Sequence, residues 1–298
     1  MKKTRSMLFA TLAALSLLAA CGTDDATPAN AGDASTTTTT AIATPMAIVS
    51  LSPTATEILF AIGAGDQVIA VDDQSSYPAD APKTDLSGFE PNVEAIAGYE
   101  PDLVVSSSND PDLLDALDKL GIEVLVQEAA IELDDVYAQI EELGVKTGHE
   151  DQANELSAGI QAEINGIADA AKGRAELTAY WELDDTYYSV TSATFIGKLL
   201  QLANVTSIAD EAQAEANDYP QLSAEYIIQA DPDLIILADT KFAHQDADAI
   251  AARPGWDGMK AVKSGSVIEM DDDIASRWGP RIVELLTLID EAAAKAAA

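Results

Sequence analysis

The chain has 298 residues and a strongly acidic composition, with 51 Asp and Glu against 16 Lys and Arg and a formal net charge of −35. A surface this negative repels nucleic acid and anionic lipid, so the composition excludes a nucleic-acid partner. The single cysteine, Cys21, excludes an internal disulfide and any cysteine-based metal site or nucleophile in the folded part.

Residues 1–20 have the organisation of a secretory signal peptide. A basic start is followed by an apolar run from Met7 to Leu18, which is too short to span a membrane, and then by Leu18-Ala19-Ala20-Cys21. This ending resembles the lipobox of bacterial lipoproteins. The resemblance implies that Cys21 becomes the acylated N-terminus of the exported protein. The acyl chains would anchor the protein to the outer face of the cell membrane, which faces the periplasm in a cell that has one.

Residues 21–45 follow as a tether of Ala, Thr, Asp and Gly with no apolar periodicity. No other segment of the chain reaches the roughly eighteen apolar residues that a transmembrane helix needs.

The folded part predicts an α/β fold with largely parallel sheets. Short β-branched runs alternate with helical patterns, as expected when helices connect parallel strands. The predicted strands are Ala47–Val49, Val68–Val71, Leu103–Val105, Val124–Val126, Ile235–Leu237 and Val267–Ile268.

One long helix is predicted between His149 and Gly173, because apolar residues there recur at steps of three and four. Gly148 and Gly173 mark its ends. The organisation that follows is an N-terminal lobe at 46–147, a linking helix at 148–173 and a C-terminal lobe at 174–298. A helical link is stiff, so we expect only a modest closure of the lobes.

An internal repeat supports two related lobes. Residues 92–105 align without gaps on residues 223–236, and each segment carries a glutamate seven residues before the proline of an acidic-Pro-Asp turn that leads into an apolar strand. Glu94 and Glu225 are the equivalent glutamates of the two segments.

Several stretches, in this order, resemble the solute-binding lipoproteins of ABC importers for iron complexes and vitamin B12. They are IVSLSPTATEILFAIGAGDQVIAV, Tyr77-Pro78, NVEAIAGYEPDLVV, TFIGKLLQLA and SRWGPRIVELL. The resemblance implies two Rossmann-like parallel-sheet lobes joined by a long helix, the class III periplasmic-binding-protein architecture. It also implies a monomer without cofactor that binds a metal complex between its lobes and delivers it to a permease dimer powered by a cytoplasmic ATPase.

In that family a glutamate on each lobe pairs with arginines of the permease, and Glu94 and Glu225 match this pattern. Their equivalence in the repeat supports the assignment, since a two-lobed protein would offer them as a symmetric pair to a dimer. The alternative is that both are ordinary solvated glutamates of an acidic surface.

Ligands of parallel α/β lobes bind beyond the carboxyl ends of the strands, so the turn around Ser52 and Thr54 should face the cleft. There, Ser52 could cap the following helix, or Thr54 and Glu57 could form a capping box, and free N–H groups would suit a polar or anionic ligand group. A cap without a ligand is the alternative. The other cleft candidates are Tyr77, Phe89, Ser107, Trp181, Lys241, His244, Arg277 and Trp278.

Trp181 and Trp278 are the preferred aromatic contacts for a large flat ligand, with core packing as the alternative. The acidic run Asp271-Asp272-Asp273 is expected to be a solvated loop, because it lacks the spacing of a calcium motif.

The scarcity of bases favours cobalamin or a related corrinoid over an anionic ligand. Only Lys241, Arg277 and Arg281 lie near the predicted cleft loops, whereas binders of anionic iron complexes gather several Arg or Lys. A ferric siderophore or haem remains the alternative, and His244 could serve as an axial ligand of haem.

An enzyme is not expected. Only His149 and His244 are available as histidines, and no HExxH, GxSxG or cysteine motif is present. A surface-anchored hydrolase and an adhesion lipoprotein are the rival classes. In an adhesion protein, however, the two repeated lobes would have no evident function.

Overall fold

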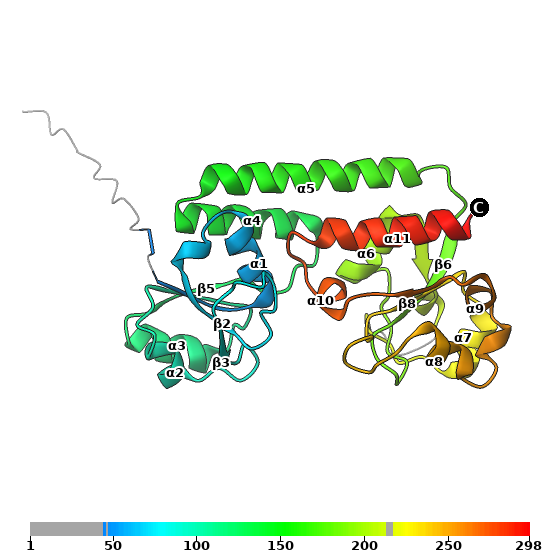
Figure 1. Cartoon of the computed structure of the whole chain (residues 1–298), viewed down its shortest axis with the longest axis horizontal. Coiled ribbons are helices and arrows are strands. Elements are labelled where there is room, and N and C mark those ends of the chain that lie inside the picture. The colour runs from blue at the N-terminus through cyan, green and yellow to red at the C-terminus, as the bar shows by residue number, and fades with distance from the viewer. Residues whose placement is uncertain (1–43, 46, 213–216) are drawn as a thin grey trace, which may run out of the picture. The chain divides into compact units, whose positions relative to one another are not determined.

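The computed structural model describes residues 44, 45, 47–212 and 217–298. The predicted signal peptide, Cys21 and most of the predicted tether lie outside these residues. Two parallel sheets, each accompanied by helices, make up two lobes of the described chain (Figure 1). Within the described ranges, no helix combines the length and the apolarity that crossing a membrane requires.

The first lobe contains a five-stranded parallel sheet in the order β3-β2-β1-β4-β5. Strands β1 (Ile48–Leu51) and β4 (Leu103–Ser106) are buried along their whole length, as expected for a parallel sheet with both faces covered. The other strands are β2 (Val68–Asp72), β3 (Lys83–Leu86) and β5 (Glu123–Val126). The helices are α1 (Pro53–Ala61), η1 (Gly65–Gln67), α2 (Val93–Ala97), α3 (Pro111–Lys119) and α4 (Leu133–Thr147).

The second lobe repeats this plan with a four-stranded parallel sheet in the order β7-β6-β8-β9. Its strands are β6 (Leu177–Glu182), β7 (Val205–Ser207), β8 (Leu234–Leu237) and β9 (Val267–Glu269). Its helices are α6 (Phe195–Leu202), η2 (Ile208–Glu211), α7 (Ala224–Ala230), α8 (Ala247–Ala252), η3 (Trp256–Gly258), α9 (Lys260–Ser264), α10 (Asp272–Ala275) and α11 (Ile282–Ala296).

Helix α5 (Glu150–Ala171) joins the lobes, which confirms the predicted linking helix. It packs along α4 and then along the C-terminal helix α11 (Figure 1). Its buried side chains, among them Ile160 and Ile164, belong to one hydrophobic cluster that also contains Ile48 of β1 and Trp181 of β6. The link is therefore part of a core shared by both lobes, and we expect this packing to limit their relative motion.

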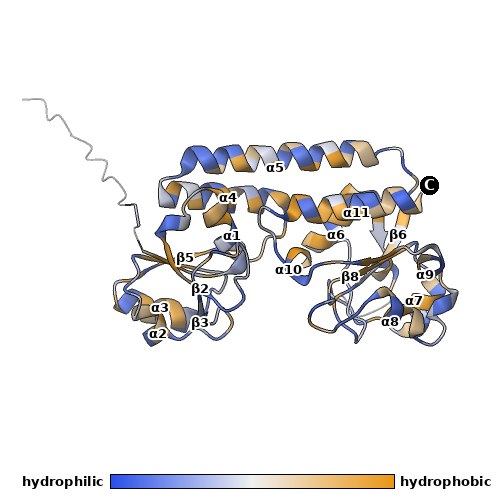
Figure 2. Ribbon diagram, viewed as in Figure 1, coloured by the Kyte–Doolittle hydropathy of each residue, from blue (hydrophilic) through white to orange (hydrophobic). Residues whose placement is uncertain are grey.

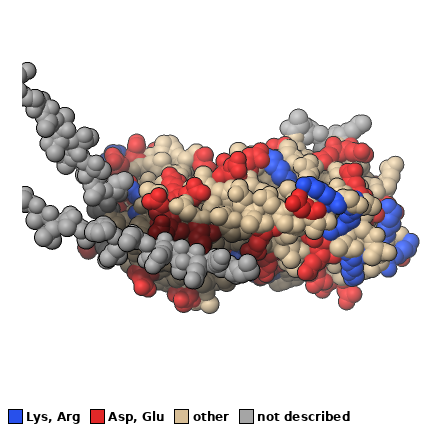
Figure 3. Space-filling view, turned by 90° about the horizontal axis from the view of Figure 1, so that it is seen from above, with Lys and Arg blue, Asp and Glu red and all other residues tan. Residues whose placement is uncertain are grey.

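Apolar residues are concentrated on the strands and on the inward faces of the helices (Figure 2). On the side that carries α5, Asp and Glu are spread over the surface, while Lys and Arg gather toward the end formed by the second lobe (Figure 3). The acidic character of the sequence is thus a property of the exposed surface, where charges remain hydrated.

The close contact between α4 and α5 depends on Gly144. A Cβ atom there would lie 2.3 Å from the Cβ of Ala153 on α5, so Gly144→Ala must push the two helices apart. We expect it to lower the free energy of unfolding by about 2–3 kcal/mol, measured by urea denaturation.

Gly159 of α5 is the matched control. A Cβ atom at this position has no neighbour within 4 Å, and Gly159→Ala should raise the free energy of unfolding by about 0.5–1 kcal/mol through helix propensity alone. Equal effects of the two substitutions would show that the α4–α5 packing is not tight.

Candidate functional site

The candidate site lies at the carboxyl ends of the strands. In each sheet the chain order reverses beside an interior strand, between β1 and β4 in the first lobe and between β6 and β8 in the second. Such switch points open crevices at the carboxyl ends of neighbouring strands.

The carboxyl-end loops of the two lobes contact one another. Ser76, after β2, donates to Asp273 of α10, which follows β9, at 2.8 Å. Arg277 donates to the backbone oxygen of Gln74 at 2.9 Å. The carboxyl-end loops of β2 and β9 therefore meet across the two lobes.

A buried cluster of charges connects the lobes at this place. Glu57 of α1 is 2% exposed and accepts hydrogen bonds from Arg277 (2.8 Å) and from Arg281 (2.9 and 2.6 Å), both of which come from the C-terminal segment. Arg277 also donates to Asp273 at 2.8 Å, and the guanidinium of Arg281 lies 4.5 Å from the ring centre of Tyr77. We call Glu57, Asp273, Arg277 and Arg281 the interlobe cluster.

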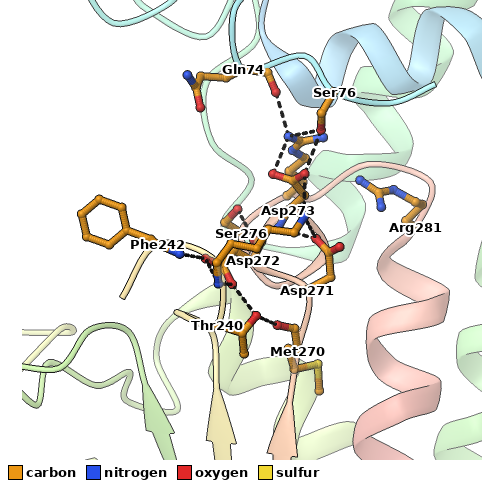
Figure 4. Close-up of polar contacts among 12 residues, drawn as sticks. Gln74, Ser76, Thr240, Phe242, Met270, Asp271, Asp272, Asp273, Ser276 and Arg281 are labelled. Carbon is orange, nitrogen blue, oxygen red and sulfur yellow. Dashed lines mark hydrogen bonds and ion pairs between the residues drawn. The ribbon is translucent and has the colours of Figure 1, made fainter. Parts of the chain in front are cut away.

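The acidic run before and within α10 is not a solvated loop, contrary to the prediction. Lys241 donates to Asp271 at 2.6 Å and to Asp273 at 3.1 Å, while Asp272 accepts from the backbone of the loop after β8 (Figure 4). Burial raises the pKa of the Asp273 carboxyl, but the hydrogen bond from Ser76 and the charges of Arg277 and Lys241 outweigh it and hold this pKa below its ordinary value.

A hollow of about 910 Å³ adjoins the carboxyl ends of β4 and β5. Gln127, which follows β5, is 4% exposed and leaves its side-chain oxygen without a hydrogen-bond partner in the described chain. The lining contains three carboxylates and no basic side chain. The lining residues with polar side chains are Asn109, Gln127, Glu128, Asp135, Gln139 and Glu142. This volume is in the range of small-molecule pockets, and its lining does not suit an anion.

The β1–α1 turn is closed, which corrects the expectation of an exposed helix N-terminus. Ser52 caps α1 by accepting from Ala55 N at 3.3 Å, so the first of the two capping schemes is the one adopted, while Glu57 is engaged in the interlobe cluster. Ser52 and Thr54 are both buried. Gly279 lies against Thr54, and Gly88 lies against the backbone oxygen of Leu51, the residue before Ser52.

The two preferred tryptophans differ. Trp181 is 0% exposed and lies inside β6, not after it, so the structure places it in the core and it offers no surface to a ligand. Trp278 is half-buried, and its indole N–H donates to Gln139 of the first lobe at 2.9 Å. Since Gln139 also lines the hollow beside β5, Trp278 remains a cleft candidate.

The other predicted residues occupy loops of the two facing edges. Tyr77 and Phe89 are exposed on the first lobe, and Ser107 is half-buried directly after β4. Lys241 and His244 are exposed on the loop after β8. Arg277 is buried in the interlobe cluster, so its charge is already neutralised.

Glu94 and Glu225 occupy equivalent positions, as the repeat predicts. Each is the second residue of a short helix, α2 or α7, and each is exposed. The preceding residues cap these helices: Asn92 accepts from Ala95 N at 2.9 Å and Ser223 from Tyr226 N at 3.2 Å. Neither side-chain carboxylate has a hydrogen-bond or ion-pair partner in the chain that the structure describes.

A second buried carboxylate lies at the switch point of the second lobe. Asp239, after β8, is 1% exposed, and neither of its oxygens has a partner among the described residues. Its neighbour Glu182 is held by Arg253 in a bidentate pair at 2.6 Å. Burial and the charge of Glu182 raise the pKa of Asp239 to about 7.

This pKa makes stability depend on pH. Asp239 takes its proton at an ordinary pKa of 3.8 in the unfolded chain and at about 7 in the folded one, so the native state binds more protons between these values. The contribution of Asp239 to stability therefore falls as pH rises from about 4 to 7. We expect Asp239→Asn to stabilise the protein by roughly 2–4 kcal/mol at pH 8 and by less than about 1 kcal/mol at pH 4.

Urea denaturation of the wild-type and Asp239→Asn proteins at pH 4, 6 and 8 measures this difference. A variant that is less stable than the wild-type protein at pH 8, or a difference that does not grow with pH, would contradict the assigned protonation.

Sequence reasoning missed several residues of the site because their roles depend on distant partners. Glu57 meets Arg277 across 220 positions, and Asp273 meets Ser76 across 197. For Gln127, the sequence offers no indication of a role in the site except that it directly follows a predicted strand. Within the described ranges, no group of three or more His, Cys, Asp or Glu side chains is arranged to hold a metal ion.

Comparison with known proteins agrees with this geometry. The model of the periplasmic binding protein family matches residues 48–274. An uncharacterised ABC transporter substrate-binding lipoprotein of Bacillus subtilis is 31% identical over an alignment that covers 95% of each chain. A cobalamin-binding protein of Halobacterium salinarum is 31% identical over 86% of this chain and 72% of its own.

Among solved structures, a possible iron-binding periplasmic solute-binding protein of Staphylococcus epidermidis matches with a TM-score of 0.72 and 26% identity, covering 84% of this chain and 99% of its own. All three are named as binding proteins, and the Bacillus subtilis protein is named as part of an ABC transporter. The chain belongs to the periplasmic binding protein family and, within it, to the substrate-binding proteins of ABC importers.

Proposed function

We propose that the chain binds cobalamin or a related corrinoid between its two lobes and delivers it to the permease of an ABC importer. The observation that carries the choice of ligand is the charge of the site. The predicted cleft cations are already paired with carboxylates: Lys241 with Asp271 and Asp273, and Arg277 and Arg281 with Glu57.

A ligand with little net charge fits such a site best. Binding a catecholate complex or the carboxylates of haem would require free Arg or Lys, and the hollow beside β5 offers carboxylates instead. Cyanocobalamin is bulky and close to neutral, so apolar contacts and hydrogen bonds suffice to hold it. The cobalamin-binding relative of Halobacterium salinarum supports the same ligand.

Docking to the permease is assigned to Glu94 and Glu225. Both carboxylates are exposed, each stands at the same position of equivalent helices, and neither is used within the described chain. Such a pair can meet basic residues on the two subunits of a dimer. The protein would act as a monomer, held at the outer face of the membrane through an acylated Cys21.

Uptake of labelled cyanocobalamin by the source organism tests the proposed function. We expect deletion of the gene that encodes this chain to lower cobalamin uptake at nanomolar ligand concentration, and reintroduction of the gene to restore the uptake. Unchanged cobalamin uptake, together with a loss of haem or ferric siderophore uptake, would keep the transport role and replace the ligand. Unchanged uptake of all three would overturn the proposal.

A further inference from the structure

The loop after β8 exposes a large apolar side chain at the proposed binding edge. Phe242 is 84% exposed, and Phe89 of the first lobe is 86% exposed. Both follow the carboxyl end of a strand, Phe242 after β8 and Phe89 after β3. An isolated exposed phenyl ring is not in itself a sign of a site, but both rings lie beyond the carboxyl ends of strands, where ligands of parallel α/β lobes bind.

The carboxylate of Asp272 holds two consecutive backbone N–H groups of this loop. Asp272 accepts from Lys241 N at 3.0 Å and from Phe242 N at 2.9 Å, and its Oδ1 lies 2.9 Å from the hydroxyl of Thr240. The same hydroxyl lies 2.7 Å from the backbone oxygen of Met270. A further bond from Ala243 N to the backbone oxygen of Asp239, at 2.9 Å, closes the turn.

These hydrogen bonds fix the backbone that carries the exposed phenyl ring of Phe242. Figure 4 shows the Phe242 ring pointing away from the polar contacts that hold its backbone. The adjacent Lys241 ammonium is turned into Asp271 and Asp273, so it does not compete for the space around the ring. Because the backbone is already ordered, a ligand would lose little entropy in ordering this contact.

We propose that Phe242 contacts the ligand on the wall formed by the second lobe, and that Asp272 is the positioning residue that holds it there. The inference rests on the proposed function and adds to it the chemistry of the contact. The ligand must carry an extended apolar face, as a large macrocyclic metal complex does, because a phenyl ring provides contact area but no hydrogen bond.

Calorimetric titration of the chain without its signal peptide, with cyanocobalamin, haemin and a ferric hydroxamate siderophore, tests this inference. For the ligand that binds the wild-type protein, Phe242→Ala should raise the Kd about tenfold or more, and Phe242→Leu should raise it less. Leu120→Ala is the control, since Leu120 is also exposed but ends α3 at the opposite edge of the sheet.

The role of Asp272 requires a separate readout, because a purely structural residue would weaken binding in any background. Asp272→Asn should weaken binding severalfold when Phe242 is present and have no further effect when position 242 is alanine. An unchanged Kd for Phe242→Ala would overturn the inference and leave the proposed function intact. Additive effects of the two substitutions would overturn the role of Asp272. A wild-type protein that binds none of the three probes would overturn the proposed function, and this inference with it.

Discussion

Replacing Glu94 and Glu225 together by alanine is expected to lower cobalamin uptake at least about tenfold while leaving the Kd for the ligand unchanged. Both carboxylates are exposed and unpaired in the described chain, so their removal costs the fold little. In the docked complex each would face a basic residue, and the loss of one partner of such a pair costs about 2–5 kcal/mol. Uptake by whole cells and calorimetry on the purified variant measure the two quantities separately.

A second double variant that removes two other exposed glutamates controls for the change in net charge. Glu155 and Glu163 are exposed on α5, and Figure 1 shows that helix on the side opposite to α2 and α7. Glu155→Ala with Glu163→Ala should retain full uptake. The docking assignment fails if the Glu94 and Glu225 variant transports normally. A weakened ligand affinity in that variant would instead place the two glutamates in the binding site.

Glu57→Ala is expected to destabilise the protein by about 3–5 kcal/mol. The substitution leaves the guanidinium groups of Arg277 and Arg281 without their shared carboxylate, in a place where Arg277 is only 8% exposed. Removing one member of a buried ion pair has this cost because the remaining charge keeps its desolvation penalty. Thermal unfolding should show a fall in Tm of roughly 10 °C.

Glu155→Ala serves as the comparison for Glu57→Ala, since an exposed glutamate of a helix should change stability by less than about 0.5 kcal/mol. Closely similar stabilities of the Glu57→Ala and wild-type proteins would mean that the interlobe cluster does not hold the lobes together. It would also mean that the pairing of Arg277 and Arg281 with Glu57 has no role in stability.

Local patterns predicted the α/β class, the linking helix and part of each sheet, whereas β3, β6 and β7 were not predicted. The strands β1, β2, β4, β5, β8 and β9 follow from β-branched runs, and the linking helix follows from apolar spacing that continues over six turns. These patterns work because parallel strands are buried on both faces and a packed helix needs one apolar stripe. The equivalence of Glu94 and Glu225 was likewise visible, since the repeat conserves spacing within one supersecondary unit.

The site was less predictable because burial there is decided by contacts between distant segments. Ser52 and Thr54 are buried in a turn against which Gly88 and Gly279 pack, at Leu51 and Thr54, and no local sequence pattern predicts these contacts. Trp181 was expected in a loop beyond the end of a strand, but it lies within β6, which extends to Glu182, and its indole is buried in the core. Strand boundaries are weakly encoded in sequence, and because both faces of β6 are covered, a residue inside this strand is buried on either face.

Equilibrium dialysis of residues 46–298 against cyanocobalamin tests the proposed binding of a corrinoid between the lobes. We expect retention of one cobalamin per chain with a submicromolar Kd that salt hardly alters, because the ligand is close to neutral and the cations of the site are paired. Failure to retain cobalamin, with saturable retention of haemin or a ferric siderophore in the same apparatus, would contradict the proposed ligand and the charge argument behind it.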